Sequence, residues 1–316
     1  NGILIDNFGN LIAKKQGRLG KPVVMLCAHL DAVGLLVKHI DKKGFIKFTK
    51  IGSITNQALL GQRVIVHAKS GNYFGVIFSP IEYLPEEKKK NQPEIEDMFL
   101  DIGCVNDEEV KQIGVQIGSV ISFDGGLAEL SGDFITGKAL DNRLGCLILI
   151  EVMKQLNEID ATVHAVGTVQ EEIGLRGARV SAFRIQPDFA IIVDTTATAD
   201  FPSLSTYGYA TLGTGPAIRI ADGARGSLKG GAIMQPRLRD FLIKVAEAEK
   251  IPYQIIIPEG ATIDASAIQL SREGVIVGIL GIPLRYSHSP CEVANLKDVE
   301  NVIKLLVKVL KRAHEI

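Results

Sequence analysis

The stretch Thr162-Val-His-Ala-Val-Gly-Thr-Val-Gln-Glu-Glu-Ile-Gly174 decides the fold, because an apolar run here ends on two adjacent carboxylates. Its first part, Thr162–Val169, has the length and composition of a buried strand in an α/β sheet. Upstream, Asp141–Leu156 spaces its apolar residues as a helix with a wide apolar face. Downstream, Phe189–Val193 is a second strand-like run. Strands that alternate with helices predict an α/β fold, with a mixed sheet sandwiched between helices.

The same alternation continues toward both ends of the chain. Val23–Ala28 is an apolar run that predicts another buried strand. Beyond residue 230 the pattern predicts strands and helices in turn: Gly231–Lys250 (helix), Tyr253–Ile257 (strand), Ala265–Arg272 (helix), Val275–Ile282 (strand) and Asn295–His314 (helix).

The region between residues 51 and 130 has a different character. Short β-like runs, Arg63–His67 and Tyr73–Phe78, flank a Ser-Gly-Asn turn, and Asp107–Gln112 predicts one short helix. This spacing is typical of a small β-barrel or sandwich. Upstream of it, Gly34–Ile40 and Phe45–Phe48 predict a hairpin. We therefore expect an α/β domain made of residues 1–45 and 130–316, and an inserted β-rich domain at 46–129.

Charge and cysteine content exclude several classes of protein. Lys and Arg number 35 and Asp and Glu 36, so no strong field attracts nucleic acid or an acidic membrane surface. The apolar runs are all shorter than the roughly 20 residues of a membrane-spanning helix. The four cysteines form no C-x-x-C pair, which predicts reduced thiols and a cytoplasmic protein.

Polar residues that could carry chemistry follow the predicted strands or begin a predicted helix. In open α/β sheets, the crevice at the carboxyl ends of the strands is where sites are built. Asp31 lies two residues beyond a strand-end histidine, so in an extended segment it could support a neighbouring metal site. The candidates are His29, Asp31, Asp141, Glu171, Glu172, Asp194 and His288.

Each candidate also has an ordinary structural role open to it. Asp141 is a favourable N-cap for the helix that it begins. Asp194 can close an Asx-turn with the next residue. Glu171–Glu172 can be a solvated acidic turn, and His29 and His288 can be structural histidines at a strand end and in a loop.

Taken together, the candidates point to a metal centre. Adjacent carboxylates at the end of an apolar strand repel each other when buried, and a cation would stabilise one as its ligand. Two histidines and three carboxylates form a nitrogen and oxygen ligand set that suits zinc or cobalt. Five ligands fit two metal ions, with one carboxylate bridging them.

The motifs around these residues resemble those of the M42 family of metallo-aminopeptidases, the glutamyl and deblocking aminopeptidases that include the tetrahedral TET enzymes. The likeness covers essentially the whole chain, including the inserted domain. The matching stretches are Ala28-His-Leu-Asp-Ala-Val-Gly34, Ala139-Leu-Asp-Asn-Arg-Leu-Gly-Cys146, Thr168-Val-Gln-Glu-Glu-Ile-Gly-Leu-Arg-Gly177, Val193-Asp194 and Arg285-Tyr-Ser-His-Ser-Pro290.

The resemblance implies a set of metal ligands. It implies two divalent ions per subunit, zinc or cobalt, in a dinuclear aminopeptidase that hydrolyses N-terminal residues from peptides. His29 and Asp194 would complete the shell of one ion, and Glu172 and His288 that of the other. Asp141 would bridge the two ions.

The resemblance also implies roles outside the ligand set. Glu171 would be the general base, and Asp31 would orient a ligand. A cis peptide would follow Asp141. The inserted domain would build dimers, which in many members assemble into a homo-oligomeric dodecamer. Residues 261–266 differ from the family's usual Gly-Thr-Asp-Ala, and we expect them to shape the substrate pocket.

Two other functions remain as alternatives. A metal-independent glycosidase of the endoglucanase type needs two carboxylates about 5–9.5 Å apart, and its chemistry gives the two histidines no role. A non-catalytic relative would keep the fold without the activity. Removing metal with a chelator separates these readings, because only the peptidase should lose its activity and regain it with metal.

Overall fold

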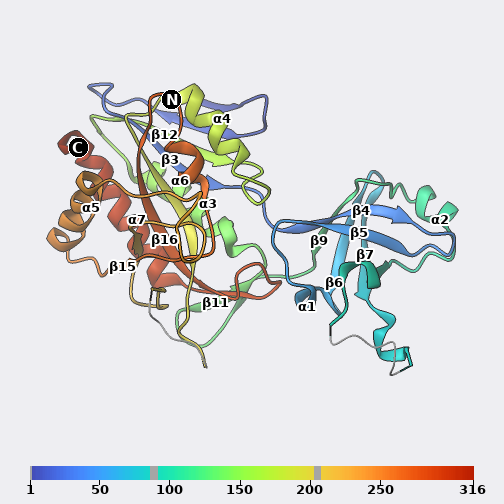
Figure 1. Cartoon of the computed structure of the whole chain (residues 1–316). Coiled ribbons are helices and arrows are strands. Elements are labelled where there is room, and N and C mark those ends of the chain that lie inside the picture. Colours follow the sequence, from blue (N-terminus) through green and yellow to red (C-terminus); the bar gives the residue numbers. More distant parts are fainter. Residues whose placement is uncertain (1, 86–91, 203–207) are drawn as a thin grey trace.

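The computed structural model describes residues 2–85, 92–202 and 208–316, and it has two units (Figure 1). The larger unit is built on a mixed sheet, and a closed β-barrel stands beside it. The order of strands across the sheet is β1 (Gly2–Ile5), β2 (Leu11–Lys15), β12 (Thr162–Thr168), β3 (Val23–His29), β13 (Phe189–Ala197), β16 (Ile276–Arg285), β17 (Glu292–Asn295), β11 (Phe134–Gly137) and β10 (Ala128–Glu129). The short strands β14 (Ala217–Arg219) and β15 (Gln254–Ile256) extend from β16.

The centre of the sheet consists of parallel strands. Strands β12, β3, β13 and β16 pair in parallel, and they correspond to four of the predicted strands. A fifth predicted strand, Tyr253–Ile257, forms β15 beside β14. Their residues are almost all buried, as expected when helices cover both faces of a parallel sheet. Because the four strands run in one direction, their carboxyl ends meet at one edge.

Helices cover both faces of this sheet, as predicted. On one face Lys15 reaches the carbonyl of Met153 in α3 (Leu140–Gln155), which packs against α7 (Leu296–Lys311). On the other face Thr168 binds Asp264 of α6 (Asp264–Ile268), which packs against α4 (Arg176–Ile185). The remaining helix, α5 (Pro236–Ala248), packs against α7 and begins later than predicted, at a proline suited to a first helical position.

The inserted unit is a barrel rather than a sandwich. Its strand order is β4 (Gly34–Ile40), β5 (Ile46–Ile51), β8 (Phe99–Asp101), β7 (Gly71–Phe78), β6 (Arg63–Ala68) and β9 (Val120–Phe123), which closes on β4. The short helices α1 (Asn56–Leu59) and α2 (Asp107–Gln112) flank it, and 3-10 turns occupy Pro80–Tyr83 and Ile95–Asp97, with a further one at Ala313–Glu315 in the larger unit. The predicted hairpin forms as β4 and β5, and both strands belong to the barrel although β4 lies within residues 1–45.

Each unit has its own apolar core. In the sheet domain Leu26, Ile191 and Ile279 lie on neighbouring central strands and are at most 1% exposed. Burying such a side chain stabilises the fold by about 1.5–3 kcal/mol. Among the described residues, none of the helices combines the length and apolar character needed to cross a bilayer.

Candidate active site and metal centre

The polar candidates meet at the carboxyl edge of the central sheet. His29 ends β3 and lies beside Thr168 at the end of β12, so the turn with Glu171 and Glu172 follows immediately alongside. Asp194 lies further along β13, the neighbouring strand. Because these strands are parallel and in register, segments distant in sequence deliver their polar ends to one place.

All five predicted ligands converge there in two groups. The first contains His29, Asp141 and Asp194, and the second contains Asp141, Glu172 and His288. Within each group the potential ligand atoms lie within 4.8 Å of one another. The Nε2 atom of His29 is 3.2 Å from Asp141 Oδ1 and 3.5 Å from Asp194 Oδ1. The Nε2 atom of His288 is 3.5 Å from Asp141 Oδ2 and 3.4 Å from Glu172 Oε2, so the two oxygens of Asp141 face different histidines.

Hydrogen bonds at Nδ1 orient both imidazoles. His29 Nδ1 donates to the backbone carbonyl of Asp31 at 2.9 Å, and His288 Nδ1 donates to the carbonyl of Ser53 at 2.9 Å. Each bond turns Nε2 toward the carboxylates, an arrangement typical of metal-binding histidines. Ser53 follows β5, so a residue from the barrel side of the molecule helps to orient His288.

Asp31 holds the turn that carries the two glutamates. Its Oδ1 accepts a hydrogen bond from the backbone amide of Glu171, and its Oδ2 accepts one from that of Glu172, both at 3.1 Å. Glu171 itself is 9% exposed and forms a further group of close potential ligand atoms with His29 and Glu172. The carboxylate of Asp31 therefore binds the backbone amides of Glu171 and Glu172, and it also lies near His29.

The start of α3 differs from a simple capped helix. The peptide bond between Asp141 and Asn142 is cis, as the family resemblance implies, and both residues have non-helical backbone angles. The regular helix begins after this kink, with Asn142 and not Asp141 at the position before it, so the N-cap role considered for Asp141 is wrong. Asn142 donates to the carbonyl of Val193 and accepts from the amide of Gly145. A Cβ at Gly145 would lie 2.2 Å from the Asn142 side-chain oxygen, so this close approach requires glycine.

Several residues around the site have a left-handed backbone without being glycine. They are Ala139 (φ 56°), Gln170 (φ 60°), Tyr286 (φ 60°) and His288 (φ 62°). This conformation is costly for side chains with a Cβ, and such residues tend to cluster at functional sites. Here Ala139 and Tyr286 lie two residues before Asp141 and His288, and Gln170 directly precedes Glu171. His288 is itself a candidate ligand.

Glu292, which is not among the candidates that the sequence indicates, supports the site from β17. It is 1% exposed, and its carboxylate accepts hydrogen bonds from the amides of Asp141 at 3.0 Å and His288 at 2.9 Å. Burial raises the pKa of Glu292 to about 7. In the sequence, Glu292 is marked only by its place before the apolar pair Val293-Ala294, two positions after the motif that ends at Pro290.

The electrostatics of the site favour a bound cation. Burial, together with nearby Asp194, raises the pKa of Glu171 to about 10. Burial, together with Asp141, raises the pKa of Glu172 to about 8. A positive charge among these groups would stabilise their ionised forms and offset the repulsion. The donor set, imidazole nitrogens with carboxylate oxygens, fits zinc or cobalt.

A cavity of about 530 Å³ opens over these residues. The stretch Ala261–Ile263, which was expected to shape the substrate pocket, lines it together with Tyr209 and Arg219. The next residue, Asp264, is instead buried beneath the site, where it accepts a hydrogen bond from Thr168 Oγ1 at 2.6 Å.

Known proteins have similar sequences and similar folds. The sequence matches the M42 glutamyl aminopeptidase family over residues 9–305. A lysyl aminopeptidase of Pyrococcus furiosus is 35% identical over 312 residues, which cover 98% of this chain and 86% of that relative. An aminopeptidase from the archaeon Desulfurococcus kamchatkensis has a similar structure, with a TM-score of 0.93 at 38% identity over 98% of this chain and 85% of its own. The TET1 peptidase of Pyrococcus horikoshii, which can assemble into a tetrahedron or a large octahedral shell, gives a TM-score of 0.86 at 32% identity over 98% of this chain and 89% of its own. The chain therefore belongs to the M42 glutamyl aminopeptidase family.

Proposed function

We propose that this chain is a dinuclear metal-dependent aminopeptidase that hydrolyses N-terminal residues from peptides, with Glu171 as the general base. The observation that carries this proposal is the pair of ligand groups that share Asp141. One ion would be held by His29, Asp194 and Asp141, and the other by Glu172, His288 and Asp141.

Each residue of the site has a separate role in the proposed reaction. Bound divalent cations, zinc or cobalt, would polarise the scissile carbonyl and make a water molecule more acidic. Glu171 takes a proton from the attacking water and delivers one to the leaving amine. Asp31 fixes the position of Glu171 through the amides of the acidic pair. Glu292 fixes the backbone of Asp141 and His288.

Metal removal tests the proposal against the alternatives. Purified protein is treated with a chelator and assayed on a panel of aminoacyl-anilides and on a β-glucan, before and after zinc or cobalt is restored. We expect anilide cleavage to disappear with the metal and to return with it. Glucan hydrolysis that is indifferent to the chelator would instead establish the glycosidase, and inactivity on every substrate would favour the non-catalytic relative.

The barrel carries a surface suited to assembly. Phe74, Val76 and Phe78 alternate along β7, point outward and are exposed. We name these three residues the β7 stripe. Exposed apolar residues gathered in this way are typical of protein interfaces. We propose that the barrel joins copies of this chain into dimers, from which a larger homo-oligomer such as a dodecamer is built.

Substitution in the β7 stripe tests this assembly. A Phe74→Lys variant should have a smaller mass than the wild type in size-exclusion chromatography with light scattering, because a charge would have to be buried in the interface. Val105→Lys is the matched control, since Val105 is an exposed apolar residue of the barrel outside the stripe. An unchanged mass for Phe74→Lys would assign the interface to another surface.

The predicted cytoplasmic location remains part of the proposal. All four cysteines are free, as expected for a protein of a reducing compartment.

A further inference from the structure

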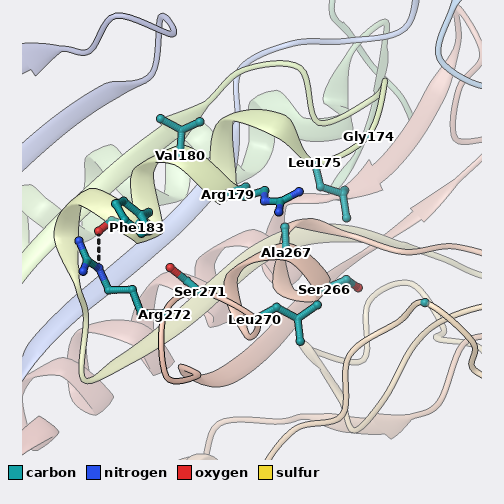
Figure 2. A pocket seen from close by; sticks show the side chains of 11 residues that line it. Gly174, Leu175, Arg179, Val180, Phe183, Ser266, Ala267, Leu270, Ser271 and Arg272 are labelled. Atoms are coloured by element: carbon teal, nitrogen blue, oxygen red, sulfur yellow. Dashed lines mark hydrogen bonds between the residues drawn. The ribbon is translucent and has the colours of Figure 1, made fainter.

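A second cavity, of about 660 Å³, lies between helices α4 and α6 (Figure 2). We call it the α4–α6 groove. Leu175, Val180, Phe183 and Leu270 make its lining largely apolar, and Phe183 and Leu270 are 57% and 78% exposed. Its volume is within the usual range for ligand pockets, about 300–1,000 Å³. Large apolar side chains so exposed beside a cavity suggest that something covers them.

The groove lies next to the cavity of the proposed active site, and one turn of the chain borders both. Gly174 and Leu175 line both the α4–α6 groove and the cavity over the metal ligands. The backbone amides of these two residues both donate to the carbonyl of Glu171, at 2.9 Å each. The tight turn that carries the general base therefore also forms the boundary of the groove.

The groove is also lined by a charged side chain without a partner among the described residues. The side chain of Arg179 makes no hydrogen bond or ion pair with any residue that the structure describes. The hydroxyl oxygen of Ser271 likewise has no partner in the described part of the chain, but it is fully buried and does not open onto the groove. Arg272 differs from Arg179, because it stacks on the Phe183 ring and donates to the Phe183 carbonyl.

We propose that the α4–α6 groove binds the part of a peptide substrate that follows the scissile bond. This inference rests on the proposed aminopeptidase function. Glu171 protonates the leaving amine, so the leaving chain begins at the turn that borders the groove. Apolar side chains of that chain pack against Phe183 and Leu270, and Arg179 pairs with a carboxylate of the same chain.

The test compares two substrates that share one N-terminal residue. One is a hexapeptide with apolar residues after the scissile bond, and the other is the aminoacyl-anilide, which is too short to enter the groove. A Leu270→Asp variant should raise KM for the hexapeptide about tenfold and leave KM for the anilide unchanged, because the apolar contact is lost only where the leaving chain is long. Leu19→Asp is the matched control, since Leu19 is exposed in the loop between β2 and β3 and lies outside the groove.

A second variant tests the role of the positively charged Arg179 side chain. Arg179→Gln should raise KM for the hexapeptide with a free terminal carboxylate more than for the same peptide as its C-terminal amide. Equal effects on both peptides would remove Arg179 from the proposal.

Other outcomes would overturn the groove assignment. If Leu270→Asp changes KM equally for both substrates, or for neither of them, the leaving chain does not bind in the groove. If it lowers the mass of the assembly while Leu19→Asp does not, a second copy of the chain occupies the groove. A wild-type protein that cleaves neither substrate would contradict the aminopeptidase function itself, a failure distinct from both.

Discussion

A Glu171→Gln variant should lose most of its peptidase activity and still bind its metal ions. We expect kcat to fall by on the order of 10²–10⁴-fold, the usual contribution of general acid–base catalysis. Glutamine has nearly the same shape but cannot accept the proton of the attacking water. The support of the turn is expected to survive, because Asp31 binds the backbone amide of Glu171 and not its side chain.

The measurement pairs steady-state kinetics on an aminoacyl-anilide with metal analysis of the same sample. Glu108→Gln provides the control, because it makes the same chemical change at an exposed position of α2 in the barrel. Full activity of Glu171→Gln would remove this residue from the mechanism. Loss of metal together with activity would make it a ligand instead of a base.

An Asp141→Asn variant should lose both metal ions, and its activity with them. Asp141 belongs to both ligand groups, so this substitution takes a negative charge from each ion at once. Asparagine preserves the size of the side chain, and the bond from the Asp141 amide to Glu292 involves only the backbone. The loss is therefore expected to come from metal affinity and not from unfolding, which circular dichroism can check.

His288→Ala is the natural comparison for this variant. His288 belongs to only one of these two ligand groups, so its loss should weaken the binding of one ion and leave the binding of the other unchanged. Metal content per chain, measured after dialysis, should fall in the order wild type, His288→Ala, Asp141→Asn. If Asp141→Asn retains as much metal as the wild type, Asp141 does not bridge two ions.

Much of the sheet domain could be predicted from sequence, and so could the meeting of the candidate residues at one edge of the sheet. The central strands are continuous apolar runs, because both of their faces are covered, and such runs are easy to recognise. A polar residue directly after such a run must lie at the edge of the sheet. This rule places His29 and Glu171 at the same edge of the sheet, and the pairing of β3 with β12 in the structure brings them close together.

What could not be predicted depends on pairing between distant segments. The role of Glu292 arises because β17 runs antiparallel to β16 and returns to the start of α3, which no local pattern indicates. Ser53 contributes only a carbonyl group, so its side chain gives no signal. The assignment of β4 to the barrel follows from its pairing with β9, more than 80 residues later in the sequence.

Residues with two compatible roles were also ambiguous in the sequence. Asp194 does accept a hydrogen bond from the amide of Thr195 at 2.7 Å, but both residues lie inside the extended strand β13, so this bond does not close an Asx-turn. Its other contact, with His29, appears only when β13 and β3 are placed side by side. A local role therefore does not exclude a role in the site.

Anomalous diffraction from zinc-soaked crystals tests the central claim most directly. Data collected on both sides of the zinc absorption edge locate each ion without reference to activity. We expect two peaks about 3.5–4 Å apart, one beside His29 and Asp194 and the other beside Glu172 and His288, with Asp141 between them. A single peak, or peaks away from these side chains, would contradict the claim.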